Sequence, residues 1–257
     1  MAQPAGPLDS PWTRRYASAP DASVRLVCLP HAGGSAPFYN ELAKALSPDV
    51  EVVAVQYPGR LERWRDPLME NLAELADVLT GELLPLTEGD FALFGHSLGT
   101  TVAFEVARRL QARGRTPVHL FASGRGAPSR HRREFATRPD DRTLLQLMRG
   151  LGGTDPRVLA DEELMRLALP VLRADYTLLD SYRYVPGPPL DCPVTALNGK
   201  EDHKVTPVDA EAWREHTTGS FDSLVFPGGH FYLVDQRAEV TGTITARLAD
   251  SRDRHGH

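Results

Sequence analysis

One serine stands in a sequence context that suits a nucleophile. Ser97 is the centre of the run Gly95-His96-Ser97-Leu98-Gly99, which follows an apolar segment and precedes a helix-like one beginning near Thr100. So tight a strand–helix turn needs small residues two positions before and after the serine, whose hydroxyl projects from a strained backbone. We therefore predict that Ser97 forms a covalent intermediate; the alternative is a glycine-flanked serine at an ordinary turn.

A serine hydroxyl becomes reactive only when an adjacent base takes its proton. Among the histidines after Ser97, His230 alone follows a strand-like segment through a flexible turn, Pro227-Gly228-Gly229. That position lies at the carboxyl edge of a parallel sheet, where ligands collect. We predict that His230 is the general base rather than a surface histidine. The other downstream histidines fall in a strand, a loop, a helix or the tail: His119, His131, His203, His216, His255 and His257.

An acid that orients the histidine should follow the preceding strand. Glu201 and Asp202 both lie just past the strand-like segment 194–197, and position alone leaves both open. We favour Asp202, partly on the resemblance given below, with Glu201 as the fallback. Its carboxylate would hold the histidine tautomer and stabilise the imidazolium without taking up the proton.

Two backbone amides must meet the oxyanion of a tetrahedral intermediate. One is expected from Leu98, the residue after the nucleophile. The second should come from the loop 30–35, where Gly33 and Gly34 let the backbone approach a substrate closely. Ala32 is the candidate; the alternative is that the two glycines form only a flexible turn. A phosphate-binding loop is excluded because no Gly-Lys-Ser/Thr follows.

The elements that must position these residues alternate along the chain. Short, nearly continuous apolar runs predict strands covered by helices on both faces, which indicates an α/β fold with a mostly parallel central sheet. The predicted strands are 24–29, 51–55, 91–94, 118–122, 194–197 and 223–226. The predicted helices are 38–46, 67–84, 100–113, 208–216 and 236–248.

One stretch interrupts this alternation. Between Ser123 and Asp191 only helix-like segments occur, near 141–149, 161–169 and 171–184, before Pro186-Gly187-Pro188-Pro189 ends them. We interpret it as a helical lid over the sheet; the alternative is an extension of the helical layer. The predicted organisation is an N-terminal extension (1–20), a core (21–124 and 190–250), a lid insertion (125–189) and a disordered tail (251–257).

Composition limits the class of protein. The chain has 257 residues, 41% hydrophobic and 25% charged, which fits one globular domain with a sizeable core. A net charge of -5 gives no reason to expect nucleic-acid binding. No secretory signal or membrane-spanning run is expected. With only Cys28 and Cys192, a disulfide framework is not expected, and we predict a reduced, cytoplasmic protein.

Four motifs together resemble one family. They are Leu29-Pro30-His31-Ala32-Gly33-Gly34-Ser35, Gln56-Tyr57-Pro58-Gly59-Arg60, Phe94-Gly95-His96-Ser97-Leu98-Gly99 and Gly228-Gly229-His230-Phe231-Tyr232. The chain, from about Trp12 to Leu248, resembles the discrete type II thioesterases of polyketide and nonribosomal peptide synthesis, which have the α/β-hydrolase fold. The first two motifs are more specific than the serine pattern.

The resemblance implies an editing activity. The enzyme would hydrolyse aberrant or stalled acyl groups from the phosphopantetheine arm of acyl or peptidyl carrier proteins, using Ser97, Asp202 and His230 with the amides of Ala32 and Leu98. It implies a lid, no metal and no cofactor, and we expect a monomer. A fatty-acyl chain-terminating thioesterase and a general carboxylesterase are the alternative enzymes. A non-catalytic binding protein of the same fold is the second class.

Two features of the lid bear on substrate and partner. Its apolar side chains either line an acyl pocket or pack the lid onto the core: Leu144, Leu147, Met148, Leu167, Leu172, Leu178 and Leu179. A basic stretch at its start is either a docking surface for acidic carrier proteins or a solvated charged face: Arg125, Arg130, Arg132, Arg133 and Arg138.

Overall fold

A seven-stranded sheet forms the centre of the protein in a computed structural model that describes residues 10–154 and 156–255. The strand order is β1-β3-β2-β4-β5-β6-β7, and every neighbouring pair is parallel except β1 with β3. The strands are β1 (Thr13–Arg15), β2 (Val24–Leu29), β3 (Val50–Val55), β4 (Phe91–His96), β5 (His119–Ser123), β6 (Val194–Gly199) and β7 (Phe221–Phe226). The predicted α/β class with a mostly parallel sheet is confirmed.

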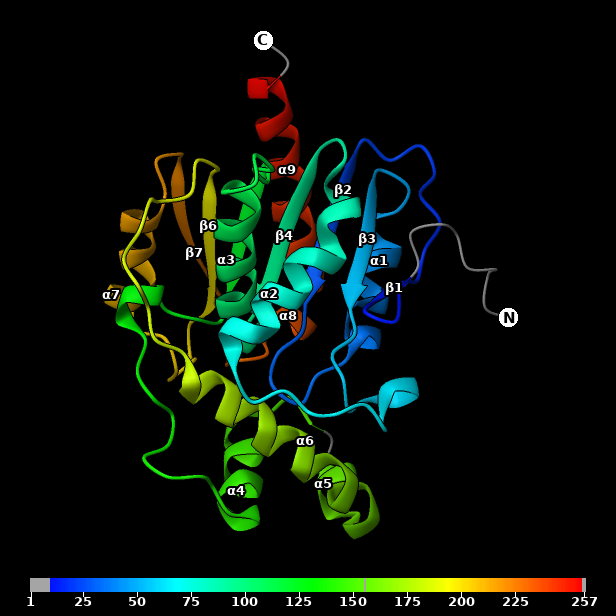
Figure 1. Cartoon of the computed structure of the whole chain (residues 1–257), viewed down its shortest axis with the longest axis vertical. Coiled ribbons are helices and arrows are strands. Elements are labelled where there is room, and N and C mark those ends of the chain that lie inside the picture. The colour runs from blue at the N-terminus through cyan, green and yellow to red at the C-terminus, as the bar shows by residue number, and fades with distance from the viewer. Residues whose placement is uncertain (1–9, 155, 256–257) are drawn as a thin grey trace.

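Helices cover both faces of this sheet (Figure 1). Helices α2 (Leu72–Leu83) and α3 (Leu98–Gln111) pack on one face, while α1 (Asn40–Leu46) and α9 (Arg237–His255) pack on the other. Alternate strand residues accordingly enter two separate hydrophobic clusters, one on each side of the sheet. Burial on both faces explains why the strands are nearly continuous apolar runs.

Shorter helices occupy the connections. They are α7 (Pro207–Glu211) and α8 (Tyr232–Asp235), with 3-10 turns at Ala36–Tyr39, Leu61–Arg63, Leu84–Thr87, Pro128–Arg130 and Ala212–His216. Thus the predicted helix 38–46 is a 3-10 turn followed by α1, and 208–216 is α7 followed by a 3-10 turn.

Three further helices lie between β5 and β6, where the described residues contain no strand. They are α4 (Asp141–Leu151), α5 (Pro156–Ala160) and α6 (Glu162–Ser181). Figure 1 shows them below the sheet, beyond the carboxyl ends of its strands, rather than within the layer formed by α2 and α3. This is the position expected of a lid, and the segment that contains α4, α5 and α6 is called the lid below.

The prediction of two lid helices separated at Pro170 is wrong. Helix α6 runs unbroken through this proline for 20 residues. A proline inside a helix costs about 3 kcal/mol because it removes one backbone hydrogen bond and crowds the preceding turn. The buried stripe nevertheless continues across it at helical spacing, through Met165, Leu169, Leu172 and Tyr176. Burial of this stripe offsets the local cost.

The two ends of the chain also differ from the expectation. Within the predicted extension, β1 adds an antiparallel edge strand to β3, so residues 13–15 belong to the sheet. At the other end α9 continues to His255, and Ser251 is fully buried, with its hydroxyl 3.1 Å from His119 Nδ1. The predicted disordered tail is therefore helical from 251 to 255. Residues 1–9 and 256–257 lie outside the described residues.

Both cysteines, Cys28 and Cys192, are buried free thiols. Burial raises the pKa of Cys192 to about 12 and that of Cys28 well above its usual range, so neither is a thiolate at neutral pH. Among the described helices, none is long and apolar enough to cross a membrane.

Candidate active site

Ser97 occupies a sharp turn between β4 and α3. Its backbone has φ 56° and ψ −115°, a conformation that costs an L-residue energy and persists at functional turns held by their surroundings. The Ser97 N–H donates to the carbonyl oxygen of Ser123 on β5, at 2.8 Å. A side chain on Gly95 would overlap the backbone of Gly99, and one on Gly99 would overlap that of Leu29. The small flanking residues predicted from the sequence are therefore required sterically.

His230 and Asp202 form a buried pair. His230 lies between β7 and α8, Asp202 follows β6, and His230 Nδ1 is 2.8 Å from Asp202 Oδ2. The two residues are only 5% and 6% exposed. The other carboxylate oxygen accepts the N–H of Lys204 at 2.9 Å, which fixes the orientation of the acid. Since Nδ1 of His230 faces the carboxylate, Nε2 of the same ring points away from Asp202.

Glu201, the fallback acid, has a different partner. Its side chain is exposed and accepts the N–H of Gly228 at 2.6 Å. The structure thus brings Asp202, rather than Glu201, to His230.

A layer of aromatic rings links the serine turn to the histidine loop. The His96 ring centroid lies 5.0 Å from that of His230 and 5.9 Å from that of His31. His96 Nδ1 is 2.9 Å from the Ser123 hydroxyl, which is in turn 2.7 Å from the Tyr232 hydroxyl. Sequence analysis missed Ser123, whose backbone and side chain hold both segments, because nothing in the local pattern marks it.

The two extra histidines are uncharged at neutral pH. Burial lowers the pKa of His96 well below its usual range, and burial together with the nearby His230 lowers the pKa of His31 to about 3. Neither ring therefore places a competing positive charge beside His230 in the resting protein.

The candidate oxyanion amides belong to residues that follow two adjacent strands, β4 and β2. Leu98 is the first residue of α3, where backbone N–H groups have no partner within the helix. Ala32 lies in the loop that follows β2, and β2 pairs in parallel with β4 so that Leu29 lies opposite Gly95. Both segments therefore leave the same edge of the sheet, as an oxyanion hole requires.

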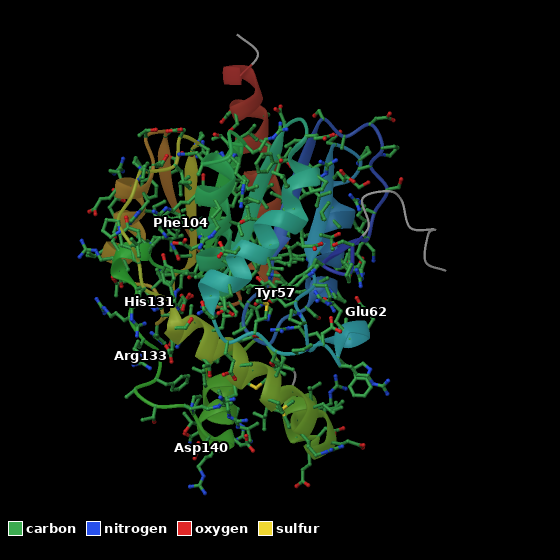
Figure 2. All side chains as sticks on the ribbon, viewed as in Figure 1. Tyr57, Glu62, Phe104, His131, Arg133 and Asp140 are labelled. Carbon is green, nitrogen blue, oxygen red and sulfur yellow. The ribbon has the colours of Figure 1, made fainter. Side chains whose placement is uncertain are left out.

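The loop that carries Ala32 is held by residues whose role sequence analysis did not predict. Gly33 N–H donates to the carboxylate of Asp175 on lid helix α6 at 2.6 Å, and Arg60 Nε donates to the carbonyl of Gly34 at 2.8 Å. The sequence marks Arg60 only as part of a motif shared with the family. Figure 2 labels the nearby Tyr57, which lies between the sheet and α6.

A scan against protein families matches residues 24–248 to the thioesterase domain. The chain belongs to the thioesterase family. It is 46% identical to the thioesterase PikA5 of Streptomyces venezuelae over 94% of this chain and 86% of that one. It also resembles the solved type II thioesterase BorB from the borrelidin biosynthetic cluster, with 47% identity, a TM-score of 0.87 and coverage of 92% and 97%.

A more distant solved structure shares the same fold. YbtT, a type II thioesterase from the yersiniabactin NRPS/PKS biosynthetic pathway, is 30% identical with a TM-score of 0.84, covering 93% of this chain and 99% of that one. The predicted α/β-hydrolase type of fold is confirmed, and the protein is a hydrolase that acts on thioesters.

An apolar groove of about 690 Å³ opens beside the loop that carries Ala32 in the thioesterase. Gly33, Gly59 and Arg60 line one side, and lid residues including Leu164 and Leu167 line the other. The apolar lid residues considered for an acyl pocket therefore differ in position: most belong to the core or pack against it, and one lies in the groove. Leu144, Leu172, Leu178 and Leu179 are buried in the core, Leu147 and Met148 pack against it, and Leu167 is 60% exposed in the groove.

The basic stretch of the thioesterase is partly neutralised within the fold. Arg125 pairs with Glu134 at 2.7 Å, and Arg138 pairs with Glu70 at 2.9 Å. Three further members are exposed, Arg130, Arg132 and Arg133, and Arg132 also lies 3.7 Å from the carboxylate of Asp209. Figure 2 places Arg133 and His131 on the segment that leads from the core into the lid. Among the described residues, no group of three or more potential ligands is arranged to hold a metal ion.

Proposed function

We propose that this protein is a discrete type II thioesterase that removes acyl groups from the phosphopantetheine arm of acyl or peptidyl carrier proteins. The observation that carries the proposal is the buried Asp202–His230 pair, whose imidazole ring lies 5.0 Å from that of His96, the residue before Ser97 at its strained turn. Two relatives support the substrate class: BorB is a type II thioesterase from the borrelidin biosynthetic cluster, and YbtT is one from an NRPS/PKS biosynthetic pathway.

In the proposed acylation step, the Ser97 hydroxyl attacks the thioester carbonyl and His230 Nε2 takes its proton. The carbonyl oxygen becomes an oxyanion that accepts hydrogen bonds from the amides of Ala32 and Leu98. The intermediate then collapses to an acyl-serine ester, and the imidazolium gives its proton to the departing pantetheine thiolate. Asp202 stabilises the imidazolium and keeps Nδ1 protonated.

Deacylation repeats these roles with water in place of the serine. His230 takes a proton from water, hydroxide adds to the ester carbonyl, and the same amides receive the second oxyanion. Collapse releases the carboxylic acid and returns the proton to Ser97. The phosphopantetheine arm belongs to the substrate, so the proposed reaction needs no metal and no separate cofactor.

The groove between the oxyanion loop and α6 is the proposed path for the acyl-pantetheine chain. It is lined mainly by apolar side chains. Two of its lining residues, Gly33 and Ser35, belong to the loop that carries Ala32. We propose further that the enzyme is a monomer and that it works in the cytoplasm, where the carrier proteins of such synthases would be accessible to it.

Ser97→Ala provides the test. Because the nucleophile is removed while the binding groups remain, hydrolysis of an acyl-loaded carrier protein should fall by about 10⁴-fold to 10⁶-fold. Loss of the acyl group from the carrier is followed by mass spectrometry, and circular dichroism checks the fold. A variant that keeps wild-type turnover would refute the proposed role of Ser97.

The same assay separates the alternative hydrolases. A type II thioesterase should have a higher kcat/KM for acyl-carrier thioesters than for matched oxygen esters, whereas a carboxylesterase should show the reverse order. A fatty-acyl chain-terminating enzyme should instead show a steep preference for long, unbranched chains. A wild-type protein without turnover on any of these substrates would indicate a binding protein.

A further inference from the structure

We propose that Asp175 of lid helix α6 is a positioning residue that, together with Arg60, sets the loop carrying the oxyanion amide of Ala32. The lid would then do more than enclose substrate: its seating would complete the oxyanion hole. This inference rests on the proposed function, because it assigns a consequence to the same site.

The carboxylate of Asp175 joins three parts of the chain. Its Oδ2 atom accepts the Gly33 N–H at 2.6 Å and also accepts from Arg60 Nη2. The two charged residues are 4% and 7% exposed and lie 115 residues apart in the sequence. A buried ion pair needs such well-placed hydrogen bonds to offset its desolvation, and removing one partner leaves the other charge buried and unpaired.

The other N–H groups of Arg60 donate to backbone carbonyls in the loop of Gly34 and in its own loop. Nε donates to the carbonyl of Gly34 and Nη1 donates to that of Pro58, both at 2.8 Å. On the other side of Ala32, the Tyr57 hydroxyl donates to the carbonyl of Pro30 at 3.4 Å. The candidate amide therefore lies between two anchored positions, one of which depends on the lid.

The lid also packs directly on this loop. Gly33 has φ +75°, and a Cβ placed on it would lie 3.0 Å from Leu172 Cδ1 on α6. Leu172 and Asp175 are three residues apart, so both project from the same side of the helix. The loop is thus fixed to α6 by an apolar contact and by a charged hydrogen bond at once.

Movement of α6 away from the sheet would break both contacts together. Gly33 N–H would lose its acceptor and Arg60 would lose its counter-charge. Because an oxyanion hole acts through donors held at a fixed place, a looser Ala32 amide would stabilise the transition state less, without a matching loss of substrate binding.

Helix α6 offers a matched control. Asp180 is also buried, at 7% exposure, and its carboxylate accepts the N–H groups of Glu134 and Phe135 at 2.6 and 3.1 Å. It has the same chemistry as Asp175 on the same helix, but its acceptor bonds hold the start of the lid insertion instead of the oxyanion loop.

The test compares Asp175→Asn with Asp180→Asn in the full chain. Two probes are used besides substrate. An acyl-pantetheine trifluoromethyl ketone forms an oxyanion when Ser97 adds to its carbonyl. Its thioether counterpart has a methylene group in place of that carbonyl. For Asp175→Asn we expect kcat and affinity for the ketone to fall in parallel by about 10-fold to 100-fold, somewhat less than deletion of a donor. Affinity for the thioether should stay at the wild-type value.

Asp180→Asn should keep the wild-type ratio of ketone to thioether affinity. Equal losses in the two variants, or unchanged ketone affinity in Asp175→Asn, would overturn the inference. If Asp175→Asn does not fold, Asp175→Glu replaces it, since glutamate keeps the charge that faces Arg60 but displaces the acceptor of the Gly33 N–H; the same selective loss of ketone affinity is expected. A wild-type enzyme inactive on thioesters would instead refute the proposed function.

Discussion

At the scale of single residues, the candidate site depends on where three side chains leave the central sheet. Ser97, Asp202 and His230 follow β4, β6 and β7, and parallel strands deliver their carboxyl ends to one edge of the sheet. Asp202 and Glu201 are neighbours in the loop after β6, but their side chains have different partners. The Asp202 carboxylate lies 2.8 Å from His230 Nδ1, whereas that of Glu201 accepts the N–H of Gly228.

Asp202→Asn should lower kcat by about 10⁴-fold, because an amide in place of the carboxylate favours the wrong histidine tautomer and does not stabilise the imidazolium. The measurement is steady-state hydrolysis of an acyl-pantetheine thioester. Glu201→Gln is the matched control, one residue away, and should retain activity within about two-fold, since exposed polar changes have small effects. Comparable losses in both variants would contradict the assignment of Asp202.

Other residues of the site were beyond the reach of sequence reasoning. Ser123 ends a strand and resembles any buried serine, while Arg60 and Asp175 lie in segments with no periodic relation to each other. Their contacts depend on how the lid is seated on the sheet. Long-range polar pairs of this kind leave no signal in spacing, composition or hydrophobic pattern.

At the scale of elements, predictions succeeded where burial dictates the residue pattern. The six apolar runs became β2 to β7, because strands covered on both faces must be apolar throughout. Strand β1, with the sequence Thr-Arg-Arg, was missed because an edge strand of three residues needs no such run. Local propensity predicts a break at Pro170, but the packing of α6 overrides it and the helix continues through the proline.

The exposed face of α6 yields a prediction about substrate choice. Leu167→Asp should lower kcat/KM for long-chain acyl thioesters by about 10-fold, since it removes part of an apolar contact worth about 1.5 kcal/mol, and leave acetyl thioesters unaffected. Stability should change little because the side chain is 60% exposed. The readout is kcat/KM as a function of acyl length.

Val208→Asp is the control for this change. Val208 is 68% exposed on α7 and does not line the groove. If both variants showed the same dependence on acyl length, the groove would not be the acyl path.

At the scale of the whole molecule, the proposed chemistry and the proposed surface for a partner lie at one end. Helices α4, α5 and α6 lie beyond the carboxyl ends of the strands, while α3 ends at the opposite edge (Figure 1). Residues of α6 line the groove, and Arg133 lies on the segment that leads into these helices (Figure 2). The net charge is -5, so any attraction for an acidic partner must come from a local surface and not from the protein as a whole.

We take Arg130, Arg132 and Arg133 as that surface, because Arg125 and Arg138 have close partners in Glu134 and Glu70. Arg132 has a longer contact, 3.7 Å to Asp209, and its side chain stays 79% exposed. Changing these three arginines to Glu should raise KM for an acyl-carrier protein by about 10-fold or more at low salt, since complementary charge mainly speeds encounter. The effect should shrink as ionic strength rises. KM for the same acyl group on free pantetheine should not change.

Arg113→Glu with Arg115→Glu is the control on the distant side of the molecule. Both arginines are exposed just after α3, so this variant shifts the net charge in the same direction without altering the lid. It should leave KM for the carrier protein near the wild-type value. If the two sets of changes raised KM equally, overall charge would account for the effect; if the lid variant slowed both substrates alike, the arginines would serve the fold and not the partner.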